Sequence, residues 1–200
     1  MKKYILIPIL LLSFLAVSQN NKEKDIDENR NKGYFNITKF SYVNVNKAEL
    51  ETYSEIDGVR VTDLPIDKAS AFSLQTINGY FFSPYFSAGL GIGLDGYSNP
   101  NINTMPLFID LRLYLSEQIS SMYLYTDFGS LIKIENGPKR GRMFNIGAGY
   151  KLALSKKNRT TIITDLGYSF KQVSNDGEPI RTSDSKILIN GLILSFGIIF

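Results

Sequence analysis

The stretch KILINGLILSFGIIF, from Lys186 to Phe200, ends the chain and decides its fold. Counted by twos, one set of its positions is wholly apolar: Leu192, Leu194, Phe196, Ile198 and Phe200. A period of two is typical of a β-strand, because successive side chains point to opposite faces. A strand this apolar would aggregate as a free edge, so we expect it to pair with neighbours on both sides. A closed β-barrel meets that requirement.

The same alternation recurs along the chain from residue 33, with turn-rich gaps between the segments. It predicts an all-β, eight-stranded antiparallel barrel of the up-and-down type, spanning residues 33–200. The predicted strands are 34–45, 69–78, 84–95, 105–115, 120–131, 142–154, 159–172 and 186–200. The gaps at 79–83, 116–119 and 155–158 are short, and those at 46–68, 96–104, 132–141 and 173–185 are longer. Such alternation of tight turns and longer loops is typical of outer-membrane barrels.

The two faces of the predicted strands differ in a way that favours lipid outside and a polar interior. One face is apolar and uncharged, with residues such as Leu90, Leu111 and Leu124. The other is rich in glycine and serine, as at Ser87 and Gly91, and carries a charge or two per strand. Small residues suit the narrow lumen of an eight-stranded barrel. The alternative is a soluble, lipocalin-like barrel in the periplasm that binds a ligand in an apolar interior.

Charged residues on the predicted interior face are the nearest approach to a functional site. An unpaired charge in a narrow lumen is costly, so we expect these side chains to form one paired network with Tyr123 and Tyr125 beside it. The network would plug the lumen; as an alternative, it would line the path of a small porin that passes ions or small solutes. Its predicted members are Lys39, Asp110, Arg112, Asp127, Lys151 and Asp165.

The N-terminus has the pattern of an export signal. Lys2 and Lys3 precede an apolar run, and Ala16-Val17-Ser18 supplies the small residues that a signal peptidase needs. We therefore expect residues 1–18 to be a signal peptide, with cleavage before Gln19. Residues 19–32 are almost entirely polar and are expected to form a flexible segment ahead of the barrel.

Composition excludes several classes of function. The 22 Lys and Arg against 19 Asp and Glu give a net charge of +3, which falls to +1 without Lys2 and Lys3, so nucleic acid is a poor candidate partner. The chain has no Cys and no His, which removes thiolate and imidazole metal ligands and every His-based catalytic dyad. Asp110 and Asp127 have no evident nucleophile to work with. We expect no enzymatic activity and no cofactor or metal.

Aromatic residues near the predicted strand ends are expected to form the girdles that anchor a barrel at the level of the lipid headgroups. They are Tyr80, Phe81, Phe82, Tyr85, Phe144, Phe170 and Phe200. The final strand resembles the C-terminal assembly signal of bacterial outer-membrane barrels, carried here by Phe196, Ile198 and Phe200. That resemblance implies recognition by the barrel-assembly machinery.

A wider resemblance rests on GYFNIT at 33–38, AFSLQTINGYFFSPYFSAGLGIGLDGY at 71–97, MPLFIDLRLYL at 105–115 and the closing NGLILSFGIIF. Together these segments resemble the small, porin-like outer-membrane β-barrels of Gram-negative Bacteroidota. The resemblance implies a fold and a location, with outer-membrane lipid as a partner, and it brings no catalytic residues. Taken with the residue patterns, it favours a structural or surface-interaction role through external loops that contact an extracellular ligand.

Overall fold

A computed structural model of the chain describes residues 31–54, 58–99, 101–132, 140–154, 160–175 and 185–200. The expected signal peptide (residues 1–18) and its cleavage site lie outside these ranges. So do residues 19–30 of the polar segment. None of the described residues forms a helix long and apolar enough to cross a bilayer. The strands are β1 (Gly33–Ser54), β2 (Gly58–Asp63), β3 (Ser70–Ser83), β4 (Phe86–Ser98), β5 (Asn101–Tyr114), β6 (Ser121–Ile132), β7 (Arg140–Ala153), β8 (Thr161–Asn175) and β9 (Ser185–Ile199).

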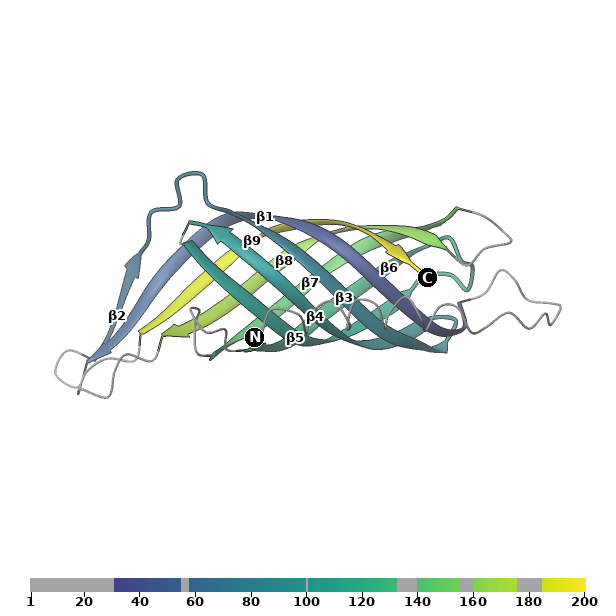
Figure 1. Cartoon of the computed structure of the whole chain (residues 1–200), viewed down its shortest axis with the longest axis horizontal. Coiled ribbons are helices and arrows are strands. Elements are labelled where there is room, and N and C mark those ends of the chain that lie inside the picture. The colour runs from purple at the N-terminus through teal and green to yellow at the C-terminus, as the bar shows by residue number, and fades with distance from the viewer. Residues whose placement is uncertain (1–30, 55–57, 100, 133–139, 155–159, 176–184) are drawn as a thin grey trace, which may run out of the picture.

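Eight of these strands close into an antiparallel barrel, as the sequence predicted. β1 and β3 to β9 pair in chain order, and β9 returns to pair with β1. The last strand is therefore hydrogen-bonded on both sides, with Phe196 opposite Thr164 of β8 and Phe40 of β1. Figure 1 shows the strands strongly tilted to the long axis, which barrel closure requires. We call the end where β1 begins and β9 ends the turn end, and the opposite end the loop end.

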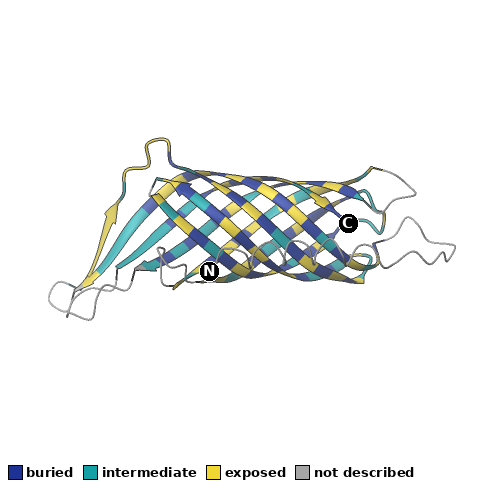
Figure 2. Ribbon diagram, viewed as in Figure 1, coloured by how far each residue is buried: buried dark blue, intermediate teal, exposed yellow. Residues whose placement is uncertain are grey.

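The two faces of the wall lie as the sequence predicted. Buried and exposed positions alternate along the strands of the barrel wall, whereas β2 is exposed along almost its whole length (Figure 2). Leu90 on the outer surface is 65% exposed, whereas Ser87, on the inner face of the same strand, is fully buried. Lys39 and Ser41 also point inward, which settles the orientation of β1. The apolar residues thus face outward and the small and charged residues fill the interior.

β1 is longer than predicted, and its extension corrects the loop expected at 46–68. Its pairing with β9 shifts by one residue between Val45 and Lys47. This β-bulge reverses the facing of the residues that follow, so Lys47 becomes exposed and Ala48 buried. The upper part of β1 then pairs with β2, which lies outside the barrel wall at the loop end (Figure 1).

The loop expected at 96–104 is also corrected. β4 continues to Ser98 and β5 begins at Asn101, and these two residues pair with each other. This connection is as short as the one between Ser83 and Phe86 at the turn end. The predicted strict alternation of short and long connections is therefore wrong at this position.

Most of the predicted girdle aromatics lie on the outer surface, but Phe81 does not. Tyr80, Phe82 and Tyr85 are exposed at the turn end, and the rings of Tyr80 and Phe82 are 5.4 Å apart. Phe81 is only 8% exposed because it points inward, where its ring packs 4.7 Å from that of Phe35. Because consecutive side chains of a strand point to opposite faces, Phe81 points inward while Tyr80 and Phe82 point outward.

Glycines on the inner face make room for bulky lumen residues. A Cβ added at Gly147 would lie 2.7 Å from the Tyr125 ring and 2.7 Å from the Cα of Gly167. We expect Gly147→Ala to lower the free energy of unfolding by about 1–3 kcal/mol, because the backbone neighbour cannot move aside freely. The matched control is Gly96→Ala, whose Cβ would meet only Asn103 Oδ1 at 3.5 Å. Urea titrations in lipid vesicles measure the free energy of unfolding of both variants. An equal loss in the two would contradict the close packing at Gly147.

Candidate functional site

Five charged side chains meet near the middle of the lumen. They come from four strands: Lys39 from β1, Asp110 and Arg112 from β5, Asp127 from β6 and Asp165 from β8. Each is at most 1% exposed. Alternation within the strands directs all five inward, and barrel closure brings β1 and β8 within reach of β5 and β6. We call these five residues the central network.

Arg112 and Asp110 form the tightest pair of the central network. Arg112 Nε donates hydrogen bonds to Asp110 Oδ1 at 2.9 Å and Oδ2 at 3.1 Å, and its Nη2 donates to Oδ2 at 3.0 Å. The guanidinium also lies 4.9 Å from the centre of the Tyr123 ring and 5.9 Å from that of Tyr125. Charge-assisted hydrogen bonds and two aromatic faces together replace the water that a buried cation loses.

Lys39 joins the other two carboxylates. Its Nζ lies 3.4 Å from Asp127 Oδ2 and 3.8 Å from Asp165 Oδ2. With Arg112 it makes two cations against three carboxylates, so one negative charge needs neutral donors. Asn145 Nδ2 donates to Asp127 at 3.1 Å, and the Tyr123 hydroxyl donates to Asp165. The sequence analysis placed Tyr123 beside the network but did not identify Asn145 as a member.

Lys151 does not join the network that the sequence predicted for it. It is buried at the turn end, where its Nζ donates to Asn31 Oδ1 and lies 4.9 Å and 4.8 Å from the centres of the Phe81 and Tyr114 rings. Among the described residues, no carboxylate lies within ion-pair distance of it. Alternation correctly places Lys151 on the inner face but says nothing about its height along the barrel axis.

Asn31 ties the end of the polar N-terminal segment to the barrel. Although residues 19–32 were expected to be flexible, Asn31 is only 4% exposed. Its side-chain amide donates to Pro84 O at 2.9 Å and its backbone N–H to Glu117 O at 3.1 Å. These bonds hold it against two turns, beside Lys151, at the turn end.

A second ion pair lies nearer the loop end and was missed by the sequence analysis. Lys171 on β8 pairs with Asp95 Oδ2 on β4, and the Thr104 hydroxyl donates to the same oxygen at 2.8 Å. The Lys171 ammonium lies 5.2 Å from the centre of the Tyr97 ring. The available signal was the inward parity of both residues, since Asp95 ends the predicted strand 84–95 and Lys171 lies in the predicted strand 159–172.

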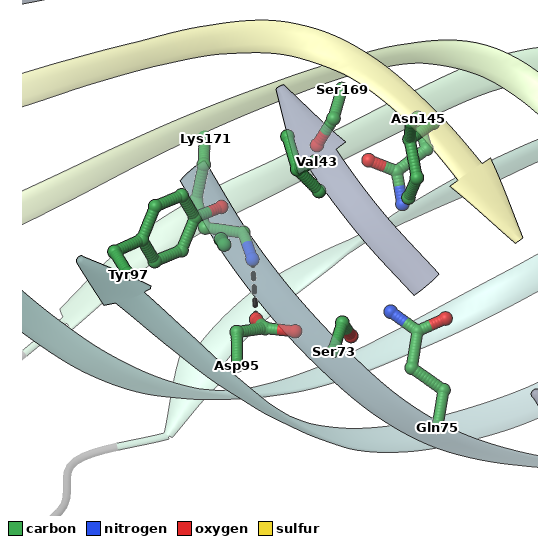
Figure 3. Close-up of a pocket in the computed structure, with 10 residues that line it drawn as sticks. Val43, Ser73, Gln75, Asp95, Tyr97, Asn145, Ser169 and Lys171 are labelled. Carbon is green, nitrogen blue, oxygen red and sulfur yellow. Dashed lines mark hydrogen bonds and ion pairs between the residues drawn. The ribbon is translucent and has the colours of Figure 1, made fainter. Parts of the chain in front are cut away.

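A small polar cavity lies between this pair and the central network. Figure 3 shows Gln75 and Asn145 extending into it from facing parts of the wall, with the Lys171 to Asp95 pair at one side. Four buried oxygens on its lining make no hydrogen bond within the described part of the protein: Ser73 Oγ, Gln75 Oε1, Asp95 Oδ1 and Asn145 Oδ1. A polar space with several such partners suits ordered water.

The carboxylates of the described residues do not gather into a metal site. No group of three or more Asp or Glu among them converges as metal ligands. The three carboxylates of the central network are instead paired with Lys39 and Arg112. What this arrangement can do chemically is fill the middle of the lumen with fixed, paired charges.

The residues of the expected assembly signal lie together on the outer surface of β9. Phe196, Ile198 and Phe200 are 56%, 40% and 39% exposed. Their side chains face the same side as the outward-facing apolar residues of the neighbouring strands, and the Phe200 backbone exchanges hydrogen bonds with Asn36 of β1. Recognition by the assembly machinery remains a prediction.

Comparison with known proteins gives a fold but no family. No protein-family model matches the chain, and no curated protein does. Among solved structures, the outer membrane protein OprG from Pseudomonas aeruginosa is 12% identical with a TM-score of 0.53, over 88% of this chain and 99% of OprG. AlkL in lipid bilayers is 15% identical over 91% and 96% of the two chains (TM-score 0.47), and Neisserial surface protein A is 14% identical over 82% and 99% (TM-score 0.42). The likeness to OprG shows that the chain has the fold of a small outer-membrane β-barrel.

Proposed function

We propose that the chain is an integral, non-enzymatic outer-membrane β-barrel whose lumen is closed to ions and which acts through its loop end. The single observation that carries this proposal is the central network. Its five side chains occupy the middle of the lumen and are at most 1% exposed, and they bond to one another rather than to a water-filled path.

The lumen on the turn side of the network supports the closed state. It is filled by buried apolar side chains of β1, β3, β8 and β9: Phe35, Ile37, Ile77, Ile163 and Ile199. Each is at most 5% exposed. A hydrated ion that reached the polar cavity from the loop end would have to cross both the charged layer and this apolar layer.

The outer surface supports a membrane location. Large apolar side chains such as Leu107, Leu124 and Leu166 are 49%, 51% and 62% exposed, and they recur around the wall. An apolar belt of this extent would aggregate in water, whereas lipid solvates it. The soluble, lipocalin-like alternative would need this face inside and the charged face outside. We therefore set it aside.

Single-channel recording in planar bilayers tests the closed lumen. We expect the refolded protein to insert without conductance steps above the bilayer background, because side chains occupy the space that a hydrated ion needs. Insertion is verified in parallel by the shift that boiling causes in gel migration. Large, stable, salt-dependent steps from inserted protein would contradict the plug and favour the small-porin alternative.

Further parts of this proposal come from the sequence. The signal peptide with cleavage before Gln19, the Bacteroidota resemblance and recognition of β9 by the assembly machinery are predictions. With the lumen closed, we assign the physiological contact to the loop end, where β2 and the upper part of β1 extend beyond the wall (Figure 1).

A further inference from the structure

Four uncharged polar side chains lie together on the outer face of β1 and β3. They are Asn36 and Thr38 on β1 and Thr76 and Asn78 on β3. Strand register places Asn36 opposite Asn78 and Thr38 opposite Thr76. Thr38 and Asn78 are exposed, and Asn36 and Thr76 are half-buried. We call these four residues the polar island.

The polar island lies within the apolar surface of the wall rather than at its rim. Its outward neighbours along β1 and β3 are all exposed: Tyr34, Tyr80 and Phe82 toward the turn end, and Phe40, Phe72 and Leu74 toward the loop end. To the sides, Asn78 lies opposite Leu90 of β4, and Thr38 lies opposite Ile198 of β9. Large apolar side chains therefore surround the island along its own strands and on both neighbouring strands.

Hydrogen bonds within the polar island use only part of its bonding capacity. Asn36 Nδ2 donates to Asn78 Oδ1 at 2.9 Å and to Thr76 Oγ1 at 3.2 Å. Among the described residues, none accepts a hydrogen bond from Asn78 Nδ2, which carries two N–H groups. A lone outward threonine differs in this respect, since the Thr126 hydroxyl donates to Asn145 O at 3.1 Å within its own wall.

An exposed carboxamide with free donors is costly in hydrocarbon, because acyl chains accept no hydrogen bonds. Polar side chains at such positions associate membrane-spanning segments by bonding across the interface. Asn78 is complementary to itself, because its Nδ2 can donate while its Oδ1 can accept a second hydrogen bond. A two-fold axis beside Asn78 lets each of two copies donate to the other, as an isologous interface requires. The free groups therefore match a second copy of the same surface.

We propose that the polar island is the centre of a lateral interface between two copies of this chain in the membrane, related by a two-fold axis beside Asn78. This inference goes beyond the proposed function and rests on its membrane location. The apolar residues around the island pack against the second barrel and keep lipid away from the central hydrogen bonds. Tyr34 and Leu90, which are 85% and 65% exposed, offer the largest free surfaces for that contact.

Energy transfer between labelled barrels in lipid vesicles tests the interface. The chain has no cysteine, so Asn101→Cys at the exposed loop end provides a single labelling site. Donor-labelled and acceptor-labelled protein are refolded together at decreasing protein-to-lipid ratios, and the transfer efficiency gives the dimerisation constant. We expect Asn36→Leu/Asn78→Leu to weaken dimerisation at least about tenfold, because two symmetric hydrogen bonds are lost.

The matched control removes a polar group from the opposite side of the barrel. Thr126→Val on β6, four strands from β1 in the ring, should dimerise as the wild type does. Because the Asn36 and Asn78 side chains lie on the outer face, the leucine variant should still fold. The gel shift on boiling shows that each variant is folded and inserted.

The outcomes separate this proposal from the one on which it rests. Inserted wild-type protein that stays monomeric at every ratio would overturn the interface while leaving the membrane barrel intact. Equal dimerisation of the leucine variant and the wild type would also overturn it, because the contact would then lie elsewhere on the wall. A wild-type protein that fails to insert would overturn the proposed function, and the lateral interface with it.

Discussion

Arg112→Ala is expected to lower the free energy of unfolding of the barrel by about 3–5 kcal/mol. Removing the guanidinium takes three hydrogen bonds from Asp110, which is fully buried and would keep its charge without a partner. The Tyr123 and Tyr125 rings would also lose the cation that lies against them. Urea titrations of the refolded variant in lipid vesicles measure the loss.

Two comparisons show whether the cost comes from a buried, unpaired charge. Lys47→Ala breaks an exposed ion pair with Glu49 and is expected to cost only about 0–1 kcal/mol. The double variant Asp110→Asn/Arg112→Met removes both charges of the central pair and should recover a large part of the stability lost in Arg112→Ala. If Arg112→Ala costs no more than Lys47→Ala, the central network does not stabilise the barrel.

The barrel itself could be predicted because its strands obey one simple rule. A wall with lipid outside and a narrow lumen inside forces each residue to match one of two environments, so parity alone assigns a face. Lys39 was assigned to the interior in this way although both faces of β1 hold apolar residues, and its side chain is buried. The apolar last strand, β9, was then expected to pair with a neighbour on each side, and this requirement predicted a closed barrel.

The rule weakens beyond Val45, toward the loop end of β1. There Lys47 and Glu49 face outward in place of apolar residues, and the contrast between the two faces fades. The β-bulge at the same point reverses parity, and strict alternation therefore breaks. For both reasons, the sequence pattern did not predict the upper part of β1 or its pairing with β2.

The candidate site shows a different limit. Parity says that Lys151 points inward, but its height depends on the tilt and register of all the strands, and these place it beside Asn31 rather than Asp110. The same lack of height information concealed the pair of Asp95 with Lys171, whose residues lie 76 positions apart in the chain. Contacts across a lumen depend on closure and are not encoded in any local pattern.

The lumen and the loop end of the barrel differ in what they could contact. The lumen holds two charged layers and two buried apolar clusters, all inside the wall. The β1 to β2 extension lies at the loop end. With the lumen closed, as we propose, the barrel is suited to contacts at that end rather than to transport along its axis.

Leu107→Arg tests the assignment of the outer face to lipid. Leu107 lies at the centre of β5, points outward and is 49% exposed. If it faces the hydrocarbon core, an arginine there should lower the free energy of unfolding by about 2–4 kcal/mol, because the guanidinium loses its water. The control on the same strand is Asn101→Arg, at the exposed loop end, which should cost about 0–1 kcal/mol. Urea titrations in vesicles compare the two variants. Arginine tolerated equally at both positions would mean that water, not lipid, surrounds the barrel, and both the membrane location and the closed-lumen proposal would then fail.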